Sequence, residues 1–299
     1  MPSHLLLFKD FNLRMKIKEN IMSWLNKLKE IAKSVTPCRY VSKKSIPAHI
    51  KPTLEPIHKS LLYDLERKRD RQGWVLHDCD AMLWQGLYGA VTKEKTTIFA
   101  AMEDSGLAYR QPKKDCLATR KSKSSWSRDM MVGMLTWCLH AKNSHALDLH
   151  FAYGQKHKWR MGFGPVSRTL YTPQIVSLLD QVRFHIKGKP YPKYKKIPYI
   201  FSSGLVDYQA HLQVLVVLII GEMYGKIPAE AFKRLEEHYK RSKRNPLYAA
   251  AMLRYGGAKY ATAAISACTS PVFDSSVRSN NQKVSEDAER LYAISLILR

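Results

Sequence analysis

The chain has few acidic residues for its length, no closely paired cysteines and no long hydrophobic run. Its longest apolar run, Val214–Ile220, lies between His211 and Glu222 and is far shorter than the roughly 20 residues of a membrane-spanning helix. Near the start, Leu5–Phe8 is too short for the apolar core of a secretory signal, and no small-residue cleavage site follows it. We therefore expect a soluble protein with no transmembrane segment and no secretory signal.

Motifs for metals and cofactors are also lacking. The histidines form no HExxH pattern, the cysteines form no CxxC pair, and the chain contains no P-loop. Gly162 and Gly164 follow no strand pattern and lack the third glycine of a dinucleotide-binding loop. The scattered cysteines are odd in number, which predicts free thiols in a reducing compartment. They are Cys38, Cys79, Cys116, Cys138 and Cys268. We expect neither a metal nor a cofactor.

Basic residues outnumber acidic ones, with 49 Lys and Arg against 25 Asp and Glu, for a formal net charge of +24. This excess indicates an anionic partner: nucleic acid, an acidic polysaccharide or an anionic membrane surface. Basic residues gather in three predicted loops, 110–123, 183–196 and 240–244, and tyrosines interleave the second. Such loops suit phosphate contacts with base stacking, an acidic glycan, or a merely solvated face.

The first 73 residues differ from the rest. Residues 11–35 have the apolar spacing of an amphipathic helix with many lysines, which would dock on a membrane surface or a partner, or pack on its own domain. A proline-punctuated linker is expected over 37–56, followed by a charged helix over 61–71. Met15 and Met22 are alternative starts. We expect a basic helix and linker over 1–73 and a helical domain over 74–299.

From Trp74 onward the sequence predicts helices joined by short polar turns, and apolar and polar residues almost never alternate as they would in a strand. Glycines 154, 188, 225 and 256 follow apolar helices at spacings of 31–37 residues, which suits a repeated helical hairpin. The expected fold is all-α, with stacked αα-hairpins forming an open solenoid or, more in keeping with the apolar helix over 205–224, a closed or partial (α/α)6 toroid. The expected helices are 79–91, 94–104, 128–142, 144–157, 173–187, 205–224, 228–241, 246–254, 258–268 and 285–298.

Two acidic clusters open apolar helices. The first holds Asp78 and Asp80, and the second holds Asp129 within Trp126-Ser127-Arg128-Asp129. Hydrolysis of a glycosidic bond needs one carboxyl to protonate the leaving oxygen and another to activate water or attack the sugar. The alternative is that these aspartates are helix N-caps, a frequent role for Asp.

Other side chains near these clusters suit sugar binding. Trp84, Trp126 and Trp159 would serve as stacking platforms or as packed core residues. Arg110 and Arg128 would hold a carboxylate or hydroxyls through forked hydrogen bonds, or form structural ion pairs with nearby Asp. His211, which opens the most apolar helix, would contact substrate or be a satisfied core histidine.

The Trp126-Ser127-Arg128-Asp129 step entering an inner helix resembles the six-hairpin (α/α)6 glycosidase superfamily, in which similar steps line the sugar subsite at the cleaved bond. The resemblance implies sugar contacts for Arg128 and Asp129, a possible acid role for Asp129, and an opposing carboxylate at Asp78 or Asp80. Over 74–257 the layout also resembles uncharacterised all-α proteins of tailed bacteriophages.

We therefore expect a phage-encoded glycan hydrolase acting on an acidic or cell-envelope polysaccharide. It would work in the cytoplasm of the infected host or in the virion. The alternative is a non-enzymatic virion or packaging protein that binds nucleic acid through its basic surface. A third reading is a membrane-surface adaptor that uses helix 11–35.

Overall fold

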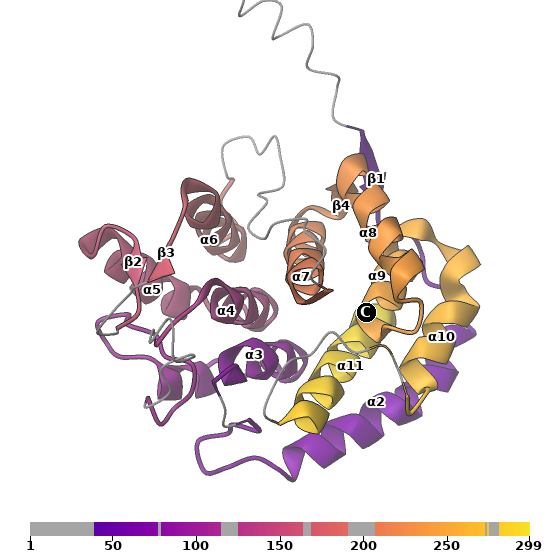
Figure 1. Cartoon of the computed structure of the whole chain (residues 1–299), viewed down its shortest axis with the longest axis horizontal. Helices are drawn as coiled ribbons and strands as arrows, with labels where there is room; N and C mark the ends of the chain where they lie inside the picture. The colour runs from indigo at the N-terminus through magenta and orange to yellow at the C-terminus, as the bar shows by residue number, and fades with distance from the viewer. Residues whose placement is uncertain are drawn as a thin grey trace, which may run out of the picture. The chain divides into compact units, whose positions relative to one another are not determined.

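The computed structural model describes residues 39–76, 79–114, 125–163, 169–190, 207–272, 274 and 281–299 (Figure 1). This part of the chain is mostly helical, with short strands only, which confirms the all-α class. The predicted amphipathic helix over 11–35 lies outside the described residues. The described helical unit runs from Tyr40 to Arg299.

From α3 onward, most helices begin and end close to the expected positions, whereas the helix expected over 61–71 begins at Ile50 and ends at Glu66. The helices are α2 (Ile50–Glu66), α3 (Ala81–Thr92), α4 (Arg128–Ala141), α5 (Ser144–Lys156), α6 (Pro173–Ile186), α7 (Asp207–Tyr224), α8 (Ala229–Arg241), α9 (Pro246–Gly256), α10 (Ala261–Thr269) and α11 (Gln282–Leu298). Two short 3-10 helices are η1 (Thr97–Ala101) and η2 (Ala258–Tyr260). The helix expected over 94–104 is therefore reduced to η1.

In the described part of the chain, four short strands form two antiparallel pairs. In the first pair β1 (Tyr40–Ser42) lies against β4 (Lys226–Pro228), with Val41 opposite Ile227. In the second, β2 (Arg160–Met161) lies against β3 (Thr169–Leu170). The first pair ties the start of the described unit to the connection between α7 and α8.

Helix α2 occupies part of the segment where a linker was expected. Pro52 is its third residue, where a backbone N–H would have no partner within the helix in any case. Pro56 lies inside the helix, yet an apolar face of Ile50, Leu54, Leu61 and Leu65 remains buried. This face packs α2 against α10 and α11, because burial outweighs the hydrogen bond that a proline removes.

Helices α3 and α4 approach closely because glycines face each other. A Cβ atom on Gly86 would lie 2.6 Å from the Cα of Gly133, and one on Gly133 would lie 2.5 Å from the Cα of Leu83. Further along, Gly89 lies against the ring of Trp137. Residues 83–89 of α3 thus meet residues 133–137 of α4 in the same order. The two helices run in parallel, and their N-termini lie at the same end.

Helices α9 and α11 also run in parallel. Asn245 Nδ2, at the start of α9, lies 3.5 Å from Oε1 of Glu289, near the middle of α11. Toward their C-termini, Arg254 donates a hydrogen bond to the carbonyl oxygen of Leu296. Helix α11 packs against α3 as well.

Helix α7 joins this parallel set at both of its ends. Near its start, the His211 ring lies 5.6 Å from Trp84 of α3 and 6.4 Å from Tyr248 of α9, centroid to centroid. Near its end, Glu222 forms a 2.9 Å ion pair with Arg254 of α9. In Figure 1, α3, α4, α7, α9 and α11 lie toward the inside of the picture, with α2, α5 and α6 outside them.

Among the described residues, no helix is long and apolar enough to cross a membrane.

The cysteines differ from the expectation of five free thiols. Cys138 and Cys268 are free and buried. Cys79 is disulfide-bonded, so the free-thiol prediction is wrong at this position.

Candidate functional site

Arg110 lies at the centre of the polar residues that meet at the start of α3. Its side chain is only 4% exposed, and Nη1 donates a 2.8 Å hydrogen bond to the Cys79 carbonyl and lies 3.4 Å from Asp80 Oδ1. The carbonyl of Arg110 accepts a 2.8 Å hydrogen bond from the N–H of Met82 in the first turn of α3. The backbone and the side chain of Arg110 thus both bind the N-terminus of this helix.

Asp129, in the first turn of α4, acts electrostatically on the same guanidinium. Its Oδ2 accepts a 3.0 Å hydrogen bond from the hydroxyl of Tyr208, in the first turn of α7. Burial lowers the pKa of Arg110, and the charges of Asp129 and Asp80 oppose this shift. Burial, followed by the same two carboxylates, raises the pKa of Tyr208, so its hydroxyl keeps its proton. Asp80, Arg110, Asp129 and Tyr208 therefore form one charged cluster, called the Arg110 cluster below.

The N-termini of three helices carry the Arg110 cluster. Helices α3 and α4 run in parallel, which brings Asp80 and Asp129 to the same end, and the Tyr208 hydrogen bond brings the start of α7 there as well. A helix N-terminus carries partial positive charge and favours nearby anions. The site can therefore hold two carboxylates close together.

Neither aspartate acts as a capping side chain. Asp80 stands at the N-cap position of α3 but makes no side-chain cap hydrogen bond. The N-cap of α4 is Ser127, and Asp129 lies in the first turn instead. Ser127 does not cap either, and its buried Oγ has no protein hydrogen-bond partner. The capping alternative thus does not explain these carboxylates.

The side chains of the Arg110 cluster differ in how far they are exposed to solvent. The Asp80 side chain is 31% exposed and Asp129 is also partly exposed, while Arg110 is buried. Carboxylates that solvent reaches can exchange protons with a bound molecule, and a buried guanidinium can hold them in position. Arg128, expected beside them, is exposed on the first turn of α4. Asp78 lies outside the described residues.

Trp126 belongs to the core. Its side chain is fully buried, and Nε1 donates a 2.6 Å hydrogen bond to the hydroxyl of Tyr171. That hydroxyl also lies 3.0 Å from His150 Nε2, and His150 Nδ1 lies 3.2 Å from the Gly106 carbonyl. The indole offers no exposed face to a sugar, so the stacking role expected for Trp126 is replaced by a structural one.

Replacing Trp126 by Phe is expected to destabilise the fold by about 1–2 kcal/mol, because the buried Tyr171 hydroxyl loses its indole donor. Urea unfolding measures the change. Trp159→Phe is the matched control, since Trp159 is only partly buried and packs against Phe151 at 5.0 Å between ring centroids. A larger loss for Trp159→Phe than for Trp126→Phe would contradict this assignment.

His150 is expected to make the free energy of unfolding decrease as the pH falls. Burial lowers its pKa to about 4, against the opposing effect of the Gly106 carbonyl. The unfolded chain, with an ordinary histidine pKa, takes up a proton as the pH falls below about 6.5, and the folded chain does so only near 4. Between pH 7 and pH 4, His150 therefore removes about 3 kcal/mol of stability. Urea unfolding of His150→Gln should show a correspondingly smaller loss over this range, and equal losses in both proteins would refute the prediction.

Trp84 and His211 lie deeper than the Arg110 cluster. Both are fully buried, in α3 and α7. His211 Nε2 lies 3.2 Å from Oε1 of Glu289 in α11, at ion-pair distance but without the alignment of a hydrogen bond. Glu289 and Tyr208 were not among the site residues predicted from the sequence. A carboxylate within the apolar pattern of 285–298 was the available signal for Glu289.

Several basic residues in the described parts of the second and third basic loops form ion pairs. Arg183 pairs with Asp148 at 2.8 Å and with Asp180 at 2.6 Å. The other pairs are Lys187 with Asp148, Lys240 with Glu236, and Arg244 with Asp274. Acidic neighbours therefore offset part of the positive charge of these loops.

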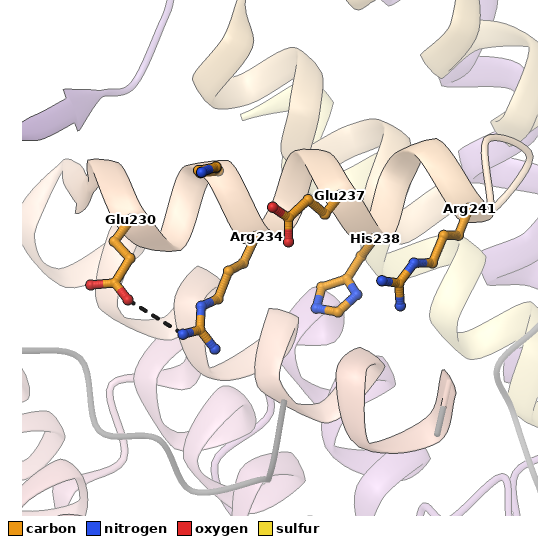
Figure 2. A pocket seen from close by; sticks show the side chains of 6 residues that line it. Glu230, Arg234, Glu237, His238 and Arg241 are labelled. Atoms are coloured by element: carbon orange, nitrogen blue, oxygen red, sulfur yellow. Dashed lines mark hydrogen bonds and ion pairs between the residues drawn. The ribbon is translucent and has the colours of Figure 1, made fainter. Parts of the chain in front are cut away.

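A pocket of about 380 Å³ lies along α8, away from the residues predicted to be functional. Figure 2 shows Glu230, Arg234, His238 and Arg241 on one side of this helix, with Glu230 and Arg234 ion-paired at 3.3 Å. Its lining residues are Glu230, Lys233, Arg234, Glu237, His238 and Arg241. Charges of both signs alternate here, so the pocket is not a strongly cationic site.

Within the described ranges, no group of three or more His, Cys, Asp or Glu side chains is arranged to hold a metal ion. Comparison with known protein families, curated proteins and solved structures finds no match for this chain.

Proposed function

We propose that this protein is a glycan-acting hydrolase in which Asp80 and Asp129 form the acid/base pair. The observation that carries the proposal is the Arg110 cluster, in which two partly exposed carboxylates act on one buried guanidinium. Asp80 lies 3.4 Å from Arg110, and the charge of Asp129 also favours its charged form. Glycoside hydrolysis needs two carboxyl groups flanking the scissile bond. One would protonate the leaving oxygen, and the other would activate water or attack the sugar.

The scaffold of the proposal is a ring of helical hairpins, a closed or partial (α/α) toroid. Five helices among the described residues, α3, α4, α7, α9 and α11, support it by running in the same direction. Contacts link α4 to α3, α3 to α11, α11 to α9, and α4 to α7, and the Glu222–Arg254 ion pair links α7 to α9. A site at the N-terminal ends of inner helices matches the arrangement that the six-hairpin resemblance implies.

Arg110 and Tyr208 would position the substrate and the two carboxylates. Tyr208 keeps its proton and can donate it in a hydrogen bond to a sugar oxygen or to Asp129. Asp78 stays the alternative partner of Asp129, and Arg128, exposed beside Asp129, would contact sugar at the outer edge. The net charge of +24 favours an acidic or cell-envelope polysaccharide as substrate, encountered in a phage-infected cell or by a virion.

The test is release of reducing ends from purified acidic capsular and cell-envelope polysaccharides, with mass spectrometry of the products. We expect cleavage of at least one acidic polysaccharide, and less with its carboxyl-reduced, neutral form. Failure to release reducing ends from the whole set of acidic polymers would overturn the hydrolase proposal.

The second proposal is nucleic-acid binding by a non-enzymatic phage protein, and the net charge favours it. Fluorescence anisotropy with double-stranded DNA would measure it at 50 and at 200 mM salt. A protein that contacts several phosphates loses orders of magnitude in affinity between these conditions. The ion pairs of the described basic loops limit the number of such contacts, so we expect weak, strongly salt-dependent binding only.

A further inference from the structure

Three fully buried polar side chains meet beneath the Arg110 cluster. They are Trp84 of α3, His211 of α7 and Glu289 of α11, each 0% exposed. The rings of Trp84 and His211 lie 5.6 Å apart, and His211 Nε2 lies 3.2 Å from Glu289 Oε1. Three helices thus bring an indole, an imidazole and a carboxylate to one point inside the helical unit.

These side chains carry polar atoms that no protein group satisfies. Trp84 Nε1, both ring nitrogens of His211 and Glu289 Oε2 are buried without a hydrogen-bond partner. Oε1 of Glu289 lies 3.2 Å from His211 Nε2 and 3.5 Å from Asn245 Nδ2. Buried polar groups in folded proteins are nearly always hydrogen-bonded, so several unpartnered ones on neighbouring side chains point to a polar binding site.

The position of this group connects it to the Arg110 cluster. Trp84 follows Asp80 by four residues on α3, and His211 follows Tyr208 by three on α7. Residues three or four apart lie on the same helix face, one turn from each other. Trp84 and His211 therefore lie one turn deeper along the faces that carry Asp80 and Tyr208.

We propose that Trp84, His211 and Glu289 form the floor of the substrate site and bind a neutral hydroxyl group of the sugar. The Trp84 N–H donates a hydrogen bond to the hydroxyl oxygen, the hydroxyl donates one to Glu289 Oε2, and His211 donates or accepts one according to its tautomer. The Glu289 carboxylate would repel an anionic substituent, so the acidic group of a sugar faces away from the floor. This inference rests on the proposed glycan-acting function.

Two-dimensional NMR of the six indole N–H signals tests the floor directly, with Trp84→Phe identifying the Trp84 signal. The probes are glucose, galactose, mannose, N-acetylglucosamine and glucuronate. We expect saturable movement of the Trp84 signal with at least one of these sugars, while the Trp159 signal stays in place. A Trp84 signal that moves with none of them would overturn the inference and leave a purely structural polar group.

Two variants separate this inference from the hydrolase proposal. Trp84→Phe keeps the aromatic ring and removes the donor, and Glu289→Gln replaces the carboxylate by an amide of the same shape. Each is expected to raise the sugar dissociation constant about tenfold, since each weakens one hydrogen bond in a buried site. Unchanged sugar binding in both folded variants would refute the floor even if the enzyme cleaves glycans. Sugar binding without any glycan cleavage would refute the hydrolase proposal alone.

Discussion

Asp129→Asn is expected to lower reducing-sugar release at least about 100-fold, because the amide cannot exchange a proton with the substrate. The amide oxygen can still accept the 3.0 Å hydrogen bond from Tyr208, so the fold should be retained. Initial rates on the cleaved polysaccharide measure the effect, and the melting temperature reports the fold.

Asp64→Asn is the matched control for this substitution. Asp64 is exposed on α2, outside the Arg110 cluster, and the same chemical change there should leave the rate unchanged. If Asp129→Asn keeps most of the activity, Asp129 is not one of the two catalytic carboxyls.

Gly133→Ala is expected to destabilise the fold by about 3 kcal/mol, near the upper end for overpacking a close contact. The added Cβ would lie 2.5 Å from the Cα of Leu83 and 2.7 Å from its carbonyl oxygen. These are backbone atoms of α3, so the helices themselves must separate. Such a separation would also move Asp80 relative to Asp129, so we expect activity to fall together with stability.

Gly188→Ala provides the comparison for Gly133→Ala. No atom lies within 4 Å of a Cβ at Gly188, so only its left-handed backbone, with φ +65°, is strained. That strain costs about 1 kcal/mol. Urea unfolding of both variants decides the matter: if the loss at Gly133 is no larger than at Gly188, then α3 and α4 are not packed through their glycines.

Several helices were predictable because their ends carry local signals. The apolar spacing after Arg128 predicted α4 to within one residue, since helix periodicity depends on neighbours a turn apart. Helix α2 was not predictable in the same way. Pro52 and Pro56 indicate a linker in local terms, and only the packing of Leu54 and Leu61 against α10 and α11 makes the segment helical.

The candidate site was predictable in part. Asp80 and Asp129 were identified as acidic residues that open helices, but their meeting at Arg110 depends on the close packing of two distant glycines. The aromatic residues were harder to interpret, because Trp126 has the same local sequence whether its ring faces solvent or the hydroxyl of Tyr171. Burial is a property of the assembled helices, so a single stretch of sequence does not reveal it.

A double-mutant cycle of Asp80→Asn and Asp129→Asn, followed by urea unfolding, tests most directly whether the two carboxylates form one site. Asp80 and Asp129 both stabilise the charge of the buried Arg110, so losing one carboxylate costs more when the other is already gone. We therefore predict that the double variant is less stable than the sum of the single changes by about 1 kcal/mol. Additivity of the two changes to within about 0.5 kcal/mol would contradict the account, because independent carboxylates do not share a guanidinium.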